Sequence, residues 1–117
     1  MAYKSKIDQA AASKRHYEAN KEKIKARTRR RNKKQNLRNR NFVAWVKKRS
    51  FCIDCGETNP LVLDFDHVRG EKKMNVSDMA RSSYSIEALM EEIDKCEVRC
   101  SNCHRIATQG RRKLNDE

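Results

Sequence analysis

Two Cys-x-x-Cys pairs constrain this chain more than any other feature of its sequence. The first pair lies in Cys52–Cys55 and the second in Cys100–Cys103. Each pair places two thiolates on one tight turn, and two such turns supply the tetrahedral four-sulfur set that structural Zn²⁺ prefers. Gly56 follows the first pair directly and suits a sharp backbone turn. We therefore expect a structural zinc ion held by Cys52, Cys55, Cys100 and Cys103.

Disulfides and redox chemistry explain these cysteines less well. The first twenty residues contain no apolar export segment, which predicts a cytoplasmic protein with reduced thiols. A redox Cys-x-x-Cys is expected within a βαβ pattern, and this sequence has two pairs and no such pattern. A segment of about 65 residues also needs a staple such as a metal ion to be stable. The fifth cysteine, Cys96, is interpreted as a small buried hydrophobic residue.

The net charge of +12 is distributed very unevenly along the 117 residues. Residues 1–50 contain 18 Lys and Arg against 3 acidic residues, whereas residues 51–117 contain 10 against 13. Dense basic segments bind nucleic-acid phosphates and carry little sequence information. We expect a nucleic acid as the partner, bound through its phosphate backbone, and the alternatives are a solubilising tail and ribosome-like or membrane-surface binding. The candidate contacts are Arg27, Arg29, Arg30, Arg31, Lys33, Lys34, Arg38 and Arg40.

The basic segment has few helix breakers and few apolar residues. No Gly or Pro precedes Gly56, and large apolar side chains are sparse before Leu37. These features predict a solvated, partly helical arm that orders fully against a polyanion. Apolar residues return at 42–46 and predict a short amphipathic helix, with Phe42 and Trp45 in the core of the head. We place a basic nucleic-acid-binding arm at 1–40 and a zinc-bracketed head at 41–117. No segment is apolar enough to span a membrane, so no membrane partner is expected.

Regular elements are expected between the cysteine pairs. Alternation at Leu61, Leu63 and Phe65 predicts a strand that ends at Asp66–His67, followed by a turn at Arg69–Gly70. A loop or a second strand is expected around residues 74–76. Ser85 is a typical N-cap for the next helix. The apolar stripe expected on that helix comprises Ile86, Leu89, Met90 and Ile93.

A further helix is expected to begin beside His104, which directly follows the last cysteine. Together these elements predict an α+β fold: a small zinc-stapled head with a long basic, largely helical arm.

Three residues of the head carry chemistry that the zinc staple does not explain. Asp66 offers an oxygen ligand for a hard divalent cation, and His104 can add an imidazole. Two protein ligands leave such a site open to water and to a phosphate oxygen. His67 can accept a proton from an attacking water near neutral pH. Asp64 shares a strand face with Asp66 and is the rival cation ligand.

Several of these residues form a recognisable combination. The segments Leu63–His67 and Cys96–His104, closed by Thr108, resemble the HNH endonuclease family, and the nearest match is its zinc-bracketed branch common in bacteriophages. The resemblance covers roughly residues 51–110. It implies a ββα-metal core, in which two strands precede a helix that carries the last histidine. It also implies that the partner bound through the phosphate backbone is DNA, and that its phosphodiester bonds are hydrolysed by nicking or double-strand cleavage. If a phage encodes the protein, the expected location is the host cytoplasm. Asp66 and His104 would hold a catalytic Mg²⁺ or Mn²⁺, and His67 would be the general base.

One position departs from the family pattern. Lys95 stands where the family has its middle Asn, whose role is to orient the loop of the catalytic histidine. Asn75, Asn102 and Lys95 itself are the candidates for that role.

Three alternative functions stay open: a non-catalytic zinc-containing DNA- or RNA-binding module, a recombination endonuclease for branched DNA, and a phage scaffold or packaging partner acting through the arm.

Overall fold

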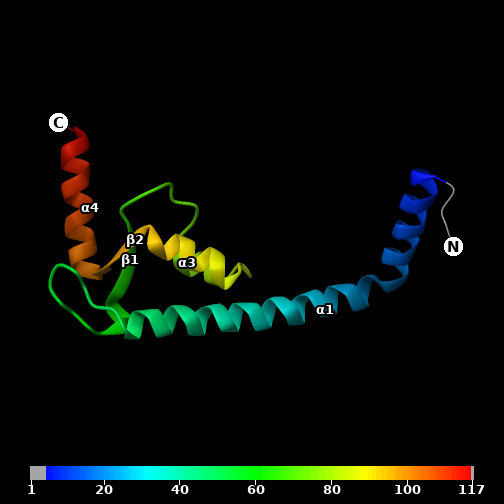
Figure 1. Ribbon diagram of the computed structural model, residues 1–117, viewed down its shortest axis with the longest axis horizontal. Helices are drawn as coiled ribbons and strands as arrows, with labels where there is room; N and C mark the ends of the chain where they lie inside the picture. The colour runs from blue at the N-terminus through cyan, green and yellow to red at the C-terminus, as the bar shows by residue number, and fades with distance from the viewer. Residues whose placement is uncertain (1–4, 117) are drawn as a thin grey trace. The chain divides into compact units, whose positions relative to one another are not determined.

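The computed structural model describes residues 5–116 and has an α+β fold, as the sequence predicts (Figure 1). Two compact units are present, Met1–Lys34 and Gln35–Glu117. The elements in chain order are α1 (Lys6–Lys48), the 3₁₀ turn η1 (Pro60–Val62), β1 (Leu63–His67), α2 (Val76–Ala80), α3 (Ile86–Asp94), β2 (Cys96–Cys100) and α4 (Ser101–Asp116).

The first unit is helical from Lys6 to its end at Lys34. The Ser5 hydroxyl accepts a hydrogen bond from the backbone N–H of Asp8 at 3.2 Å, which satisfies one free donor at the start of α1. Asp8 also places a negative charge in the first turn, where the helix dipole favours it. The arm is therefore helical from Lys6 onward, where the sequence predicts only partial helix.

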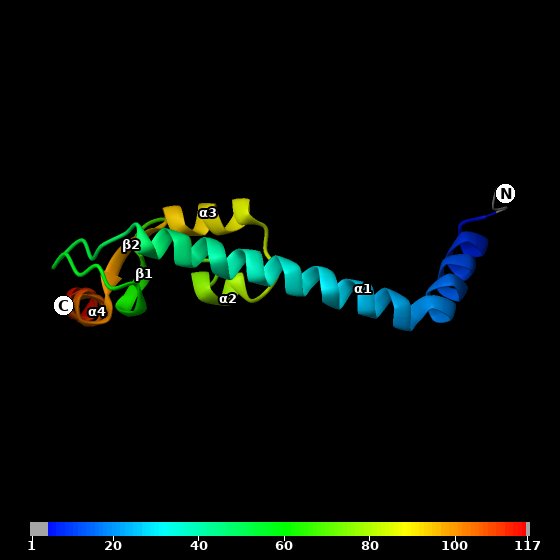
Figure 2. The ribbon, with the colours of Figure 1, turned by 90° about the horizontal axis from the view of Figure 1, so that it is seen from below.

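The main core of the second unit lies where α2 and α3 pack against the end of α1, and Figure 2 shows one of these two helices on either side of α1 in that view. Asn39 is fully buried in this region, and its amide donates to the backbone carbonyl of Tyr84 at 2.8 Å. Its side-chain oxygen accepts from Gln35 at 2.9 Å. These bonds satisfy the polar group that burial would otherwise penalise. The buried apolar residues of this core are Val43, Val76, Met79, Ala80 and Leu89.

Trp45 does not join that core, so this prediction is wrong. Its side chain remains 51% exposed, stacked on Phe42 and covered by Arg49. Val43 provides the buried face of α1. Trp45 lies two residues further along the helix, so its side chain points about 200° around the helix axis from that of Val43. Phe42 is partly buried against the core, as expected. The short helix predicted around residues 42–46 is not a separate element. It is the last part of α1, which continues through it as one helix.

The hairpin is formed by β1 and β2, which pair antiparallel from Leu63 opposite Cys100 to His67 opposite Cys96. The sequence predicts a strand from Leu61, but Leu61 lies in η1 and is 91% exposed. Asn59 causes this shift, because its side chain accepts from the N–H of Leu61 at 3.0 Å and caps the turn. The strand then begins at Leu63, which is buried.

The turns and helices of the head follow the sequence closely. Gly70 adopts a φ of +68° after β1, where a side chain would be strained. Ser85 caps α3 by accepting from the N–H of Ala88 at 3.1 Å. Residues 74–76 form no strand, since α2 begins at Val76. Met90 is exposed rather than buried, and Glu92 occupies the inward position of α3 instead.

Candidate metal centres

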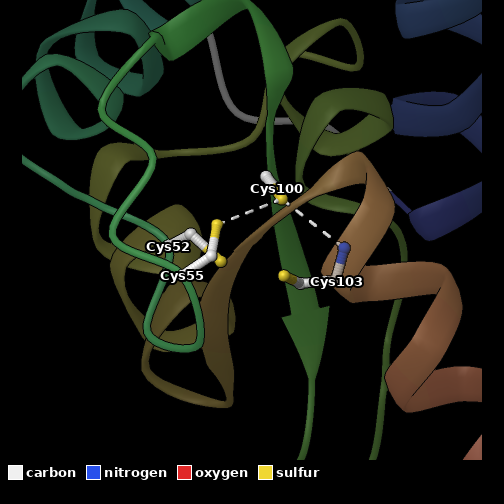
Figure 3. Close-up of side chains that lie close together, drawn as sticks. All are labelled: Cys52, Cys55, Cys100 and Cys103. Atoms are coloured by element: carbon white, nitrogen blue, oxygen red, sulfur yellow. Dashed lines mark hydrogen bonds between the residues drawn. The ribbon is translucent and has the colours of Figure 1, made fainter.

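The four predicted zinc ligands converge into one cluster (Figure 3). Their sulfur atoms all lie within 4.8 Å of one another, and Cys55 Sγ lies 3.7 Å from Cys100 Sγ. A tetrahedral zinc site with Zn–S bonds of ~2.3 Å has sulfur–sulfur edges of ~3.8 Å. The cluster therefore has the ligand type, the number and the spacing of a structural Zn²⁺ site.

Each half of this cluster is a hydrogen-bonded turn. In the first, Gly56 N–H donates to the Cys52 carbonyl at 2.9 Å, with the glycine at a φ of +81°. In the second, Cys100 ends β2, Cys103 lies in the first turn of α4, and the Cys103 N–H points at the Cys100 sulfur at 3.5 Å. A bond from Ile53 N–H to the Val98 carbonyl at 3.0 Å ties the first turn to β2.

The acidities of the thiols fit a site that needs a cation. Burial opposes ionisation of Cys52, but backbone N–H groups around its sulfur lower its pKa to about 6. The pKa of Cys103 is raised far above its ordinary value, chiefly by its contact with the Cys100 thiol and by burial. Four thiolates at this spacing repel one another, and a divalent cation offsets that repulsion.

Cys96 lies outside the cysteine cluster, and it is partly buried where the sequence predicts a buried residue. It is partly buried against the main core, and its thiol donates to the Glu92 carbonyl at 3.3 Å. Burial and the negative charges of Glu92 and Asp66 raise the pKa of this thiol to about 11. A thiol that resists ionisation makes a poor metal ligand.

The corner between the hairpin and α4 brings together the two predicted ligands of the catalytic cation. His104 Nε2 lies 3.4 Å from Oδ1 of Asp66, a carboxylate that is only 3% exposed. The other ring nitrogen, Nδ1, lies 3.1 Å from Oδ2 of Asp64. The rival ligand Asp64 thus also reaches His104, from the same strand face as Asp66.

Two arginines already occupy the carboxylate of Asp66. Arg99 on β2 donates to its Oδ2 at 2.8 Å and also contacts Asp54, which lies between the first two cysteines. Arg111 on α4 donates to Oδ1 at 2.8 Å and to Oδ2 at 3.2 Å. Asp66 is therefore a fully paired buried charge, and Arg99 links it to the cysteine cluster through Asp54.

The donor set of Asp66 and His104 suits a hard cation, with one condition. Octahedral Mg²⁺ with ligands at ~2.1 Å has neighbouring ligands ~3.0 Å apart, close to the 3.4 Å between these two side chains. Within residues 5–116, however, the cysteine cluster is the only group of three or more metal-ligating side chains. A cation at Asp66 would thus have two protein ligands and would have to replace an arginine.

His67 is directed away from this pair. It follows Asp66 in a regular strand, so the two side chains leave opposite faces of the hairpin. Its Nε2 lies 2.9 Å from Oε2 of Glu92 on α3, whereas Asp66 contacts α4. The structure therefore brings together Asp66 and His104 but places His67 against α3.

Lys95, one of the three candidates for the loop-orienting role, is bonded to the loop after His67. Its carbonyl accepts from the N–H groups of Val68 at 2.9 Å and Arg69 at 3.1 Å. Its ammonium group donates to the Glu71 carbonyl at 2.8 Å and to Glu92 Oε1 at 2.9 Å. Of the three candidates for the loop-orienting role, Lys95 is the one with these contacts.

Three residues around the site escaped the sequence reasoning: Glu92, Arg99 and Arg111. Glu92 could have been noticed as a charge three residues after Leu89, on the apolar stripe of α3. Arg111 lies seven residues after His104 and therefore on the same helix face. Arg99 faces the same side of the hairpin as Asp64, its partner in the register.

The predicted phosphate-binding residues are all exposed on α1, six in the first unit and two in the second. None of the eight forms a salt bridge within residues 5–116, so their charges remain available to bind phosphates.

A surface groove of about 340 Å³ also lies beside His104. Its lining comprises His104, Arg105, Thr108, Gln109 and Arg112.

Comparison with protein-family models, curated proteins and solved structures finds no match for this chain. In the part of the chain that the structure describes, no helix is both long and apolar enough to cross a bilayer.

Proposed function

We propose that this chain is a metal-dependent DNA endonuclease of the HNH type, stabilised by a structural zinc ion. The observation that carries the proposal is the 3.4 Å approach of His104 Nε2 to Asp66 Oδ1. These two side chains come from a strand and from the helix that follows the second strand, in the order that a ββα-metal core requires. The adjoining cysteine cluster braces the same corner through Arg99 and Asp54.

In this proposal Asp66 and His104 hold a divalent cation, Mg²⁺ or Mn²⁺. The bound cation would supply charge stabilisation to the phosphodiester as negative charge builds up on it. Because His67 and Asp66 leave opposite faces of β1, the scissile phosphate would lie across the end of the strand, between the cation and the imidazole. There His67 takes a proton from water, whose oxygen forms a bond to phosphorus while the bond to the 3′ oxygen breaks. The 3′ oxygen leaves and acquires a proton from solvent. The products are 5′-phosphate and 3′-hydroxyl ends.

The remaining basic residues position the DNA. Arg105 and Arg112 line the groove beside His104, where they can contact phosphates that flank the scissile bond. The eight exposed basic residues of α1 supply affinity that depends on salt and not on sequence.

Plasmid nicking tests the proposal directly. Zinc-loaded protein is incubated with supercoiled plasmid in Mg²⁺, in Mn²⁺ and without divalent cation. We expect cleavage that needs added cation and that falls by about 10²–10⁴-fold in His67→Ala, while DNA binding is retained. His104→Ala should also abolish cleavage. Wild-type protein that binds plasmid but leaves it uncut under every condition would contradict the proposed activity.

The paired state of Asp66 favours a second candidate, a non-catalytic zinc module that binds nucleic acid. In that case Arg99 and Arg111 neutralise Asp66 permanently, and the corner serves stability alone. The same experiment separates the two functions, since the second predicts DNA binding without nicking. The variant Asp66→Asn would then lower stability without any effect on plasmid integrity.

A further inference from the structure

Glu92 is a buried carboxylate in a part of α3 that faces the end of β1. It is 1% exposed, and burying an unpaired charge is costly. Three donors offset this cost. Oε2 contacts His67 Nε2 at 2.9 Å and accepts from the Lys73 N–H at 3.0 Å, while Oε1 accepts from Lys95 Nζ at 2.9 Å. Three hydrogen-bond donors around one side chain suit an ionised carboxylate, which only accepts hydrogen bonds.

The ionised state of Glu92 follows from its surroundings. Burial alone raises the pKa of a carboxyl group, but the hydrogen bonds from Lys95, Lys73 and His67 outweigh it and lower the pKa of Glu92 to about 2. An ionised carboxylate can only accept hydrogen bonds. The nitrogen of His67 that faces it must therefore carry a hydrogen.

We infer that Glu92 is a positioning residue that holds His67 as its Nε2–H tautomer and leaves Nδ1 as the nitrogen that can accept a proton. The geometry gives Nε2 a carboxylate partner at 2.9 Å, and no protein group within residues 5–116 hydrogen-bonds to Nδ1. A neutral imidazole has one donor and one acceptor nitrogen, so assigning the donor also assigns the base. The catalytic part of this inference rests on the proposed endonuclease function.

Lys95 completes the arrangement at the end of α3. Its ammonium group bridges Glu92 and the Glu71 carbonyl, and its own carbonyl holds the N–H groups of Val68 and Arg69. The carboxylate that orients the ring and the backbone that follows the ring are thus fixed by the same short segment. His67 has little freedom to present its other nitrogen to Glu92.

Nitrogen NMR of the wild-type protein tests the tautomer without a cation, DNA or a substitution. The zinc-loaded protein is labelled with ¹⁵N-histidine and recorded near pH 8, and the His67 signals are assigned by their loss in His67→Gln. We expect the pattern of an Nε2–H imidazole for His67. A predominant Nδ1–H form, or equal populations of the two, would overturn the inference even if the protein cleaves DNA.

Cleavage kinetics of a variant pair test the positioning role. Glu92→Gln keeps the shape of the side chain but replaces the two carboxylate oxygens with one amide oxygen and one NH₂ group. The NH₂ group can donate to His67, so we expect a mixture of the two His67 tautomers. Its kcat for nicking should fall about 10–100-fold, as is typical for residues that orient a reacting group, while KM changes little. Glu91→Gln removes a charge from the adjacent exposed position and should leave tautomer and kcat unchanged.

The two readouts separate this inference from the proposed function. A folded Glu92→Gln protein with wild-type kcat would overturn the positioning role while leaving the endonuclease intact. If wild-type protein shows the Nε2–H form but never cleaves DNA, the function fails and the tautomer assignment stands. Should Glu92→Gln not fold, the wild-type spectrum still decides the assignment.

Discussion

Arg111 on α4 makes a two-point contact with Asp66 on β1, across 45 positions of sequence. The guanidinium group donates to both carboxylate oxygens, at 2.8 Å and 3.2 Å. The side chain of Arg111 is 45% exposed and its other contact is to Thr108, whereas Arg99 is held on three sides by acidic residues. Arg111 is therefore the partner of Asp66 that a cation can replace most easily.

Removing this guanidinium should strengthen cation binding. In zinc-loaded Arg111→Gln we expect Mn²⁺ to bind about tenfold more tightly than in wild type, because a charged hydrogen bond of ~1.5 kcal/mol no longer competes for Asp66. Isothermal titration calorimetry gives the dissociation constants. Arg112→Gln removes the same charge from the next residue and serves as the control. Equal tightening in both variants would attribute the effect to net charge and contradict direct competition.

Removal of zinc should unfold the head. A strong chelator that removes zinc from the cysteine cluster is expected to abolish the thermal transition of the second unit. The hydrophobic cores of this unit are small, so the free energy of zinc binding supplies much of its folding free energy. Cys100→Ser should have the same effect. Cys96→Ser is the matched control, since Cys96 lies outside the cluster, and it should retain one zinc per chain. A transition that persists unchanged in the chelator would argue against a structural metal.

The salt dependence of DNA binding should depend on α1. The slope of log K against log salt is expected to flatten by about 0.9 for each phosphate that the protein no longer neutralises. Replacing the six basic residues between 27 and 34 by Gln should therefore flatten it strongly while keeping the helix. Fluorescence anisotropy at several salt concentrations measures the slope. Glu18→Gln with Glu22→Gln makes the arm more basic and should not flatten it. An unchanged slope in the first variant would exclude these residues from phosphate binding.

Glu92 should make acid stability differ between wild type and Glu92→Gln. Its pKa is about 2 in the folded protein against an ordinary 4.5, so its ionised form stabilises the fold fully above pH ~4.5. That contribution, on the order of 3 kcal/mol, is lost as the pH falls toward 2. Urea unfolding at several pH values should show a difference between the two proteins that is constant at neutral pH and shrinks in acid. A difference independent of pH would contradict the paired, ionised carboxylate.

Local signals in the sequence predicted much of the fold. The Cys-x-x-Cys spacing predicted the four-sulfur cluster, Ser85 the start of α3, and the position of His104 the last helix. Each of these features depends on contacts within a few residues, or on a ligand chemistry with very few alternatives. Predictions that needed packing to be known were less accurate. Trp45 and Met90 are large apolar residues of the kind found in protein cores, but they lie on the exposed sides of their helices.

The environment of the candidate site could not be predicted in the same way. Lys95 was a candidate for the loop-orienting role, but its bonds to Glu92 and Glu71 depend on how α3 meets the end of β1. The choice of Arg99 and Arg111 as partners of Asp66 depends on the hairpin register and on the direction of α4.

The sequence by itself determined the four-cysteine cluster, the uneven charge and the residue types of the candidate cation site, because these follow from composition and short spacing. Only the tertiary structure decided that Asp66 faces α4 and His67 faces α3, and that a buried carboxylate holds the histidine. The physical reason is that adjacent strand residues point to opposite faces, so different long-range neighbours surround each of them. Those neighbours, and not the two residues alone, determine which nitrogen and which oxygen are free to react.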